Sequence, residues 1–231
     1  MSEPIAFIIG AGKNIGAGTA DALRSRSYRI ALAARSLKNG DSKDGNLLLS
    51  LDLTKPDAVS NAFATVRKEW GEPSVVHYNA AAAHFTSAED VVATSVPDFA
   101  QDLVINTTSV YAAIKESLAG FDALPASTPK AFFYTGNILN EGPRPGLLTL
   151  GVGKVASAQI IELADDAYGK KGYRFFYVDE RKADGSSKGT TIDGPAHGEF
   201  IASLIDGGND VPWQATFVAG KGYVKFPRAQ L

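Results

Sequence analysis

Short apolar segments alternate with segments of helical spacing along this chain. The apolar segments are rich in β-branched and aromatic residues and cover residues 5–9, 28–33, 47–51, 74–78, 131–135 and 174–178. Apolar residues recur at helical spacing after them, at about 14–26, 56–70, 97–119, 151–169 and 196–206. This order predicts strands that alternate with helices. Because the strand segments are apolar at nearly every position, they predict a doubly wound α/β fold, with a mostly parallel sheet covered by helices on both faces.

The segments between these elements are polar. Residues 36–46 predict a polar loop, and residues 180–195 predict a longer Gly-, Ser- and Lys-rich loop that we expect to be the most mobile part of the chain. Residues 215–226 predict a final strand with a Gly-Lys-Gly turn. No repeat or low-complexity linker divides the chain, so we expect residues 1–231 to form a single domain.

Composition and charge exclude several classes of function. Of the 231 residues, 45% are hydrophobic and 21% are charged, and the formal net charge is -2. Since the charges are mixed in sign, they predict no basic surface and no nucleic-acid partner. The chain has no cysteine, which excludes disulfides and thiolate chemistry. The three histidines, His77, His84 and His197, are too scattered to predict a metal site.

The chain also lacks the signals of export and membrane insertion. Its first residues lead directly into an apolar strand, without the basic segment and cleavage site of a secretory signal. No apolar run is long enough to cross a bilayer. We therefore expect a cytoplasmic protein with no membrane partner.

A glycine-rich turn joins the first predicted strand to the first predicted helix. Glycines let such a turn approach a diphosphate closely, and the free N–H groups at the start of the helix bind its charge. In this context the turn predicts a dinucleotide site. The residues we expect to bind the cofactor there are Gly10, Gly12, Lys13, Asn14, Ile15 and Gly16.

The second strand indicates which dinucleotide binds. In NAD-binding proteins, an acidic residue at the end of this strand binds the ribose 2′-hydroxyl. Here the strand is followed by Ala34, Arg35 and Ser36. Arg35 and Lys13 could converge on a 2′-phosphate, with Ser36 beside them, because arginine suits the planar recognition of phosphate. We therefore predict NADP(H) rather than NAD(H) as the cofactor.

Residues 10–16 resemble the TGxxxGxG motif of the short-chain dehydrogenase/reductase family. Ile9 stands in place of the threonine and Asn14 in place of the middle glycine. The resemblance runs through the whole chain and is strongest over residues 5–170. It implies a single Rossmann domain, an oxidoreductase activity and a small-molecule substrate.

Further motifs carry the resemblance in the same order and spacing. Asp52, followed by Leu53, matches the family's aspartate beside the adenine. The family's NNAG motif, which closes around the cofactor after the fourth strand, is similar to a segment that contains Asn79, Ala80 and Ala81. Asn106 matches the helix asparagine that holds a water of the family's proton relay.

The resemblance is incomplete at the catalytic unit, a serine followed about thirteen residues later by Tyr-x-x-x-Lys. Lys154 matches the lysine, which binds the nicotinamide ribose in the family, but Leu150 stands at the tyrosine and Asn137 at the serine. Another Tyr-x-x-x-Lys string, at Tyr111 and Lys115, lies before the fifth strand, and we interpret it as a chance spacing on an amphipathic helix.

Several groups could replace the missing tyrosine as the source of the proton. Lys154 could relay a proton through water to Asn106, and Asn137 could donate a hydrogen bond to a carbonyl oxygen. Tyr134 is either a group that touches substrate or a core aromatic, and the same alternatives hold for Tyr78.

His84 also remains open. It either faces the ligand side of the sheet, where it follows the fourth strand, or is an ordinary exposed loop histidine.

Two functions remain open at this point. The first is an NADPH-dependent reductase of a small apolar carbonyl, imine or enone, in which Leu150 packs against the substrate. The second is a protein that binds NADP(H) without redox chemistry, as a sensor or scaffold. Residues Glu180 and Arg181, with the loop that follows, lack the Pro-Gly of many family members and could form a substrate lid. By resemblance to the family, helices 97–119 and 151–169 imply a homodimer or homotetramer.

Overall fold

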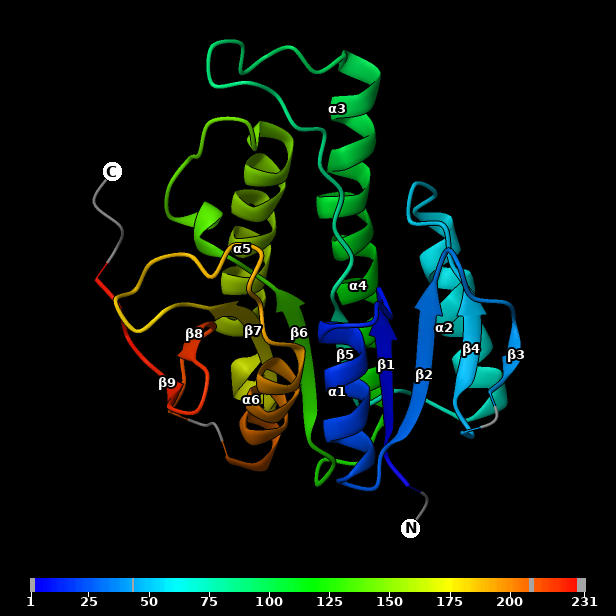
Figure 1. Ribbon diagram of the computed structural model, residues 1–231. Coiled ribbons are helices and arrows are strands. Elements are labelled where there is room, and N and C mark those ends of the chain that lie inside the picture. The colour runs from blue at the N-terminus through cyan, green and yellow to red at the C-terminus, as the bar shows by residue number, and fades with distance from the viewer. Residues whose placement is uncertain (1–2, 43, 208–209, 228–231) are drawn as a thin grey trace.

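The computed structural model describes residues 3–42, 44–207 and 210–227, and its centre is a nine-stranded sheet. The strand order is β3-β4-β2-β1-β5-β6-β7-β8-β9 (Figure 1). Only the pairs β3–β4 and β8–β9 are antiparallel. The strands are β1 (Ile5–Ile9), β2 (Arg29–Ala34), β3 (Gly40–Asp41), β4 (Leu47–Ser50), β5 (Val75–Tyr78), β6 (Lys130–Thr135), β7 (Tyr173–Glu180), β8 (Gln214–Val218) and β9 (Gly222–Tyr223). The predicted doubly wound, mostly parallel sheet is confirmed.

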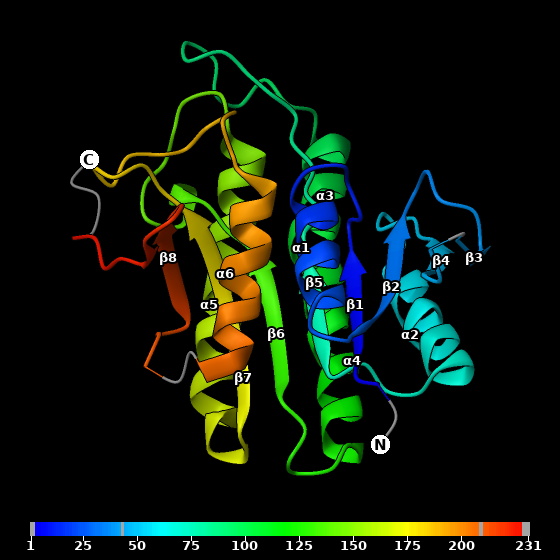
Figure 2. The same cartoon turned by 60° about the horizontal axis from the view of Figure 1, so that its bottom comes forward.

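Helices cover both faces of the sheet. The longer helices are α1 (Ile15–Arg24), α2 (Asp57–Glu69), α3 (Val96–Leu103), α4 (Ser109–Ala123), α5 (Leu148–Tyr168) and α6 (Gly194–Gly207). Short helical turns are η1 (Val104–Thr108), η2 (Ile138–Asn140) and η3 (Gly169–Lys171). Helices α1 and α6 lie side by side on one face, and α4 and α5 lie on the other (Figures 1 and 2).

Alternate residues of each central strand point into two separate cores. Ile5, Phe7 and Ile9 of β1 pack with α2, α4 and α5, whereas Ala6 and Ile8 pack with α1 and α6. All five are buried. This explains why the strand segments are apolar at nearly every position, since burial on both faces removes the polar half of a strand pattern.

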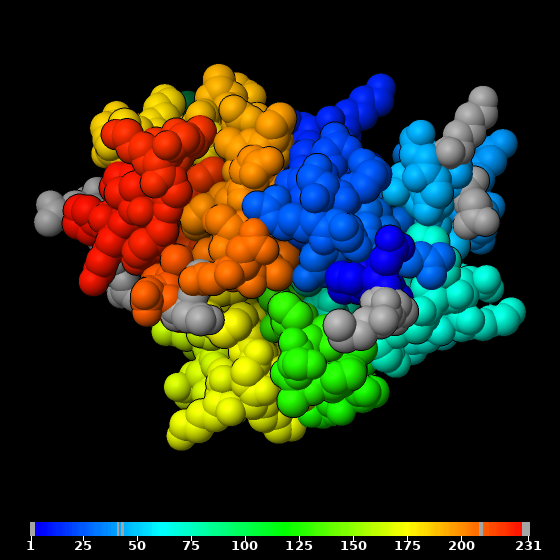
Figure 3. All heavy atoms as spheres, turned by 90° about the horizontal axis from the view of Figure 1, so that it is seen from below, coloured from blue at the N-terminus to red at the C-terminus, as the bar shows by residue number. Residues whose placement is uncertain are grey.

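Helices α1 and α6 approach each other through glycine. A Cβ atom at Gly18 would lie 2.1 Å from the carbonyl oxygen of Gly194, and one at Gly198 would lie 2.1 Å from the carbonyl oxygen of Gly18. No side chain fits at these positions. Figure 3 shows the two helices, in blue and orange, in direct contact.

The structure corrects several predicted boundaries. The helix predicted at 97–119 is interrupted by η1, a π-helical turn, so α3 and α4 are separate elements. The strand predicted at 215–226 is a hairpin of two strands, β8 and β9, and β3 lies inside the predicted polar loop 36–46. Strand β7 extends to Glu180, two residues beyond its predicted end. Within the described ranges, no helix combines the length and apolarity needed to span a membrane.

Candidate active site

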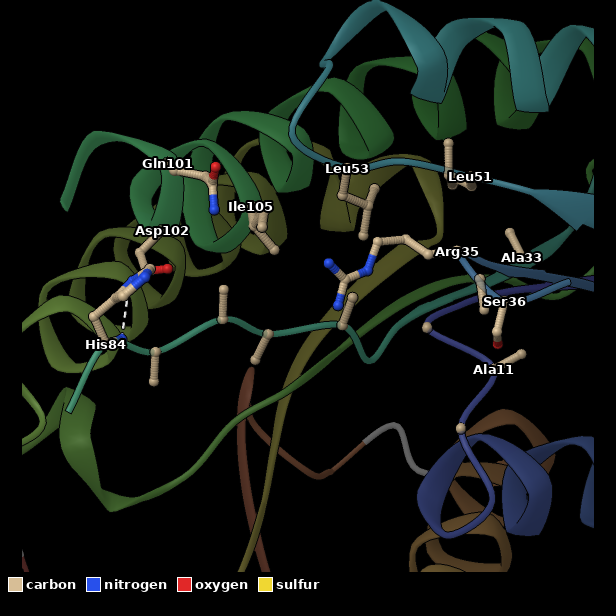
Figure 4. Close-up of a pocket in the computed structure, with 17 residues that line it drawn as sticks. Ala11, Ala33, Arg35, Ser36, Leu51, Leu53, His84, Gln101, Asp102 and Ile105 are labelled. Atoms are coloured by element: carbon tan, nitrogen blue, oxygen red, sulfur yellow. Dashed lines mark hydrogen bonds and ion pairs between the residues drawn. The ribbon is translucent and has the colours of Figure 1, made fainter. Parts of the chain in front are cut away.

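A large cleft lies at the carboxyl edge of the sheet, beside β1, β2 and β5. We call it the cofactor cleft; its volume is about 840 Å³. It brings together seven of the residues predicted to bind the cofactor, namely Gly10, Gly12, Arg35, Ser36, Leu53, Ala80 and Ala81. Ala11 and Ser36 lie at one end of the cleft, and His84 and Asp102 lie at the other (Figure 4).

The glycine turn is shaped by close backbone contacts. Gly10 has a φ of 94°, and a Cβ there would lie 2.4 Å from the amide nitrogen of Ala80. A Cβ at Gly16 would lie 2.9 Å from the carbonyl oxygen of Gly10. Only glycine fits at these two positions. Gly12 faces open space, which leaves room for a ligand against the turn.

The remaining residues of the turn face away from the cofactor cleft. Asn14 donates a hydrogen bond from Nδ2 to the carbonyl oxygen of Ile192 (3.0 Å), and its Oδ1 accepts one from the backbone N–H of Gly194 (2.9 Å). Ile15 is buried in the protein, and Lys13 is exposed without lining the cleft. Asn14 therefore fastens the glycine turn to the start of α6.

Arg35 is the cation that enters the cofactor cleft. Its side chain points into the cleft beside Leu53 (Figure 4). Nearby Asp52 does not line the cleft, because its Oδ1 accepts hydrogen bonds from the backbone N–H (3.1 Å) and the hydroxyl (2.8 Å) of Thr54. These bonds lower the pKa of Asp52, and Arg35 lowers it further.

A chain of buried hydrogen bonds joins β1, β5 and β6 beside the cofactor cleft. Asn79 Nδ2 donates to the carbonyl oxygen of Gly10 (2.8 Å), and Asn79 Oδ1 accepts from the hydroxyl of Thr135 (2.8 Å). That hydroxyl lies 2.8 Å from Nε2 of His77. Since Thr135 gives its own proton to Asn79, His77 Nε2 is the donor to Thr135. Burial lowers the pKa of His77 to about 3, so this ring is neutral. Sequence reasoning did not identify His77 or Thr135.

Asn106 lies in the π-helical turn η1, and its side chain holds the segment after β5. Its Nδ2 donates to the carbonyl oxygen of Ala82 (2.7 Å), and its Oδ1 accepts from the backbone N–H of Ala82 (2.9 Å). The carbonyl oxygen of Asn106 accepts a hydrogen bond from the hydroxyl of Ser157 (2.6 Å). Both polar atoms of the amide therefore position a wall of the cofactor cleft, and Ser157 is a contact that the sequence did not reveal.

A second cavity, which we call the chamber, lies at the carboxyl ends of β6 and β7. Its volume is about 350 Å³, and both Asn137 and Leu150 line it. Oδ1 of Asn137 accepts from the backbone N–H of Leu139 (3.0 Å), and within the described residues its Nδ2 has no acceptor. The structure thus brings together the two residues predicted from the motif spacing.

Lys154 is buried in the protein and lines neither of the two cavities. Its Nζ donates to the carbonyl oxygen of Thr135 (2.6 Å) and lies 4.4 Å from the ring centroid of Tyr134. Burial lowers the pKa of Lys154 to about 7. Tyr134 is itself fully buried in the core, and burial raises its pKa well above the ordinary value for tyrosine.

Charged residues at the end of β7 form a wall of the chamber. Arg181 is 1% exposed; its Nε lies 2.5 Å from Oδ2 of Asp179, and its Nη2 lies 3.4 Å from Oε2 of Glu141. Glu180 pairs with Lys188 (2.7 Å) and accepts a hydrogen bond from the backbone N–H of Asp193 (2.7 Å). Glu180 and Arg181 therefore do not form a lid, because both side chains are buried in ion pairs. Ser187 and Lys188 of the loop that follows line the chamber, and the role of this loop as a lid stays a prediction.

The structure also shows the surroundings of three further residues from the sequence analysis. His84 lines the cofactor cleft, and its Nδ1 lies 3.0 Å from Oδ2 of the buried Asp102, which raises the pKa of the imidazole. Tyr111 is 58% exposed on α4 and lines neither cavity, as expected for a chance motif. Tyr78 is fully buried and donates to the carbonyl oxygen of Ile105 (2.6 Å), so it is a core aromatic.

Comparisons with known proteins agree with this architecture. A family model described as "Enoyl-(Acyl carrier protein) reductase" matches residues 10–140. The chain is 44% identical over 238 residues to "Short chain dehydrogenase/reductase dmxR12" of Cryptosporiopsis sp. (strain 8999), with 98% of this chain and 96% of that protein covered. The chain belongs to the short-chain dehydrogenase/reductase family.

Solved structures of short-chain dehydrogenases/reductases and related enzymes share the fold. An alcohol dehydrogenase from Thermococcus sibiricus, complexed with 5-hydroxy-NADP, has a TM-score of 0.74 and 19% identity over 97% of this chain and 100% of that chain. A 3-ketoacyl-(acyl-carrier-protein) reductase from Brucella melitensis, complexed with NADH, has a TM-score of 0.76 and 17% identity over 94% of this chain and 97% of that chain. One ligand is a derivative of NADP and the other is NADH, so this shared fold does not select between the two cofactors.

The candidate site therefore has two cavities. Backbone, small side chains and Arg35 line the cofactor cleft, and Asn137 and Leu150 are among the residues that line the chamber. Within the described part of the chain, no group of His, Asp and Glu side chains is arranged to hold a metal ion.

The buried lysine predicts a pH-dependent stability. Because the pKa of Lys154 is lowered from 10.5 to about 7, the unfolded chain binds more protons than the folded one between these values. The contribution of Lys154 to the free energy of unfolding therefore rises with pH across that range, by at most about 1.4 kcal/mol per pH unit. The Lys154→Met variant should lack this increase in stability with pH, and it should be more stable than the wild type at pH 7.

Urea denaturation at several pH values between 7 and 10.5 measures this effect. The exposed Lys115 provides the matched control, since Lys115→Met should keep the wild-type dependence on pH. Parallel stability curves for the wild type and Lys154→Met would contradict the assignment of a buried, titrating ammonium.

Proposed function

We propose that the protein is an NADPH-dependent reductase that acts on a small apolar carbonyl, imine or enone with a proton source other than tyrosine. The observation that carries the proposal is the chamber. Leu150, four residues before Lys154 on α5, presents an apolar side chain to this cavity, and Asn137 stands beside it with a free Nδ2 group. An apolar side chain beside a neutral hydrogen-bond donor suits a small, weakly polar substrate.

The cofactor cleft fits a dinucleotide. Its glycine turn leaves open space at Gly12, and its floor is made of small residues, Ala80 and Ala81 among them. Arg35 enters the cleft where an NAD-binding site would carry an acidic residue, and this supports NADP(H). When bound, the reduced cofactor would supply the hydride. The expected contributions of Lys13, Asn14 and Asp52, and of Lys154 at the ribose, stay predictions.

The residues of the chamber would position the substrate. The Nδ2 group of Asn137 can donate to a carbonyl oxygen as its negative charge develops, and Leu150 can pack against the apolar part of the molecule. Loss of a general acid typically costs ~10²–10⁴ in rate, which an enzyme with good positioning can tolerate. Asn106 would contribute by fixing Ala82 rather than by holding a water with its amide.

One observation favours the alternative, a protein that binds NADP(H) as a sensor or scaffold. Lys154 is buried against Thr135 and lines neither cavity. Binding without turnover requires no proton relay, so a lysine that serves only the core is compatible with it.

The first test is turnover. Purified protein with NADPH should consume the cofactor in the presence of at least one member of a panel of apolar aldehydes, ketones, cyclic imines and enones, measured by the absorbance of NADPH. The reaction without substrate is the control. Binding of NADPH with no turnover on any class would favour the sensor, and no binding of either dinucleotide would contradict both functions.

The second test concerns the phosphate. Arg35→Asp should weaken the binding of NADPH about 10- to 100-fold, the value of one charge-assisted hydrogen bond, and should improve the binding of NADH. Fluorescence titration measures both dissociation constants. Lys38→Asp makes the same charge change in the same loop outside the cofactor cleft and should leave the preference unchanged. An equal effect of the two substitutions would rule out a specific contact with Arg35.

We further propose a homodimer or homotetramer built on α4 and α5. Val155 and Leu163 lie eight residues apart on α5, hence on one face of the helix, and are 51% and 59% exposed. Tyr111 adds a large exposed ring on α4. Exposed apolar faces of this kind mark contacts between subunits.

Leu163→Glu should convert the oligomer to a monomer, as measured by sedimentation velocity, because it would bury a charge in the contact. Val92→Glu is the control, since Val92 is 73% exposed but precedes α3. A wild-type protein that sediments as a monomer at all concentrations would refute the proposal.

A further inference from the structure

A buried carboxyl group faces the chamber from the end of β7. The side chain of Asp179 is 1% exposed, and Asp179 lines the chamber together with Asn137 and Leu150. We propose that Asp179 is the proton donor of this site, because Leu150 has no proton to donate. This inference rests on the proposed reductase function.

One oxygen of the Asp179 carboxyl group contacts Arg181, and the other oxygen has no hydrogen-bond donor among the described residues. Oδ2 of Asp179 lies 2.5 Å from Nε of Arg181. Among the described residues no group donates a hydrogen bond to Oδ1. An acid that is oriented by one oxygen and offers the other to a cavity has the geometry that general acid catalysis requires.

The charges around Asp179 allow it to carry a proton. Arg181 also faces Glu141, with 3.4 Å between Nη2 and Oε2, so the guanidinium keeps an anionic partner when Asp179 is neutral. Burial raises the pKa of Asp179 to about 7, and Glu141 contributes to the increase, whereas Arg181 and Lys154 oppose it. The other titratable residues that line the chamber are Arg144, Glu180, Lys188 and His197. The last three form their own cluster, in which Lys188 pairs with Glu180 (2.7 Å).

The other candidate donors are less well placed. Tyr134 is fully buried, which raises its pKa well above the ordinary value, and Lys154 does not line the chamber. His84 lines the cofactor cleft rather than the chamber. Asn137 faces the chamber but has no acidic proton to transfer. Asp179 combines a position in the chamber with an acidity matched to neutral pH.

The proton transfer balances with NADPH as the reductant. As hydride from the cofactor reaches the carbonyl carbon, the π electron pair moves to the carbonyl oxygen. That oxygen takes the proton from Asp179, so the O–H bond of the carboxyl breaks and the O–H bond of the alcohol forms. Asp179 is left as a carboxylate beside Arg181, and water in the chamber returns the proton.

The decisive variant is Asp179→Asn, whose amide oxygen can still accept from Arg181. We expect kcat for a carbonyl substrate to fall by ~10²–10⁴, with the dissociation constant of NADPH unchanged within a factor of about two. For the wild type, kcat should be constant below pH 7 and fall above it, because the protonated carboxyl is the active form; the variant should lack this dependence. The matched control is Asp165→Asn, which removes a carboxylate 3.5 Å from Arg174 at the other end of β7 and should leave kcat unchanged.

A second measurement does not depend on turnover or on the folding of the variant. The infrared spectrum of the wild type should show a protonated carboxyl at pH 6 that is lost above pH 8, and Asp179→Asn should lack the band. A wild type without this titration, or a variant with wild-type kcat, would overturn the role of Asp179 while leaving the reductase function intact. A wild type that shows the titration but reduces no carbonyl, imine or enone would overturn the reductase function, and the donor role with it.

Discussion

Thr135, the last residue of β6, connects the centre of the sheet to the site. Its hydroxyl accepts from His77 and donates to Asn79, and its carbonyl oxygen accepts from the ammonium of Lys154. Asn79 in turn donates to the carbonyl oxygen of Gly10. The polar atoms of these hydrogen bonds are buried or partly buried. Each bond therefore offsets the cost of removing a polar group from water. The relative positions of β1, β5 and β6, and hence of the cofactor cleft and the chamber, depend on these contacts.

The chamber owes its shape to a second polar group, the ion pairs at the end of β7. Charged residues directly after an apolar strand would ordinarily turn toward water. Here Arg181 is shared by Asp179 and Glu141, and Glu180 is paired with Lys188. Because opposite charges meet within the protein, the strand continues through Glu180 and supplies a wall where a loop was expected.

The sequence predicted the parts of the molecule that depend on local pattern. Apolar strands buried on both faces and the glycine turn at residues 10–16 were predicted because strand periodicity and glycine geometry act over a few residues. Asn137 and Leu150 were predicted from the resemblance to the family's catalytic unit. Arg35 was also placed in the cofactor cleft, since the end of a strand fixes which way the next residues face.

Contacts between distant segments could not be predicted in this way. The hydrogen bonds of Asn14 reach residues 178 and 180 positions away, and those of Asn106 and Ser157 join different helices. The burial of Lys154 depends on the carbonyl group of Thr135, which has no signature in the sequence. The adjacent charges of Glu180 and Arg181 were the available signal of a buried cluster, and they suggested a lid because Glu141 and Lys188, which pair with them, lie elsewhere in the chain.

The π-helical turn η1 has a consequence for how this region can vary. It holds one residue more than a regular α-helical turn would need, so it offsets α3 from α4 by about 100° of rotation about their common axis. Asp102 on α3 and Asn106 in the turn face the cofactor cleft and its wall only with this offset. If the same residues formed a regular α-helix, α3 would turn by about 100° relative to α4 and carry Asp102 away from His84, so the width of this one turn decides which side chains line the cofactor cleft.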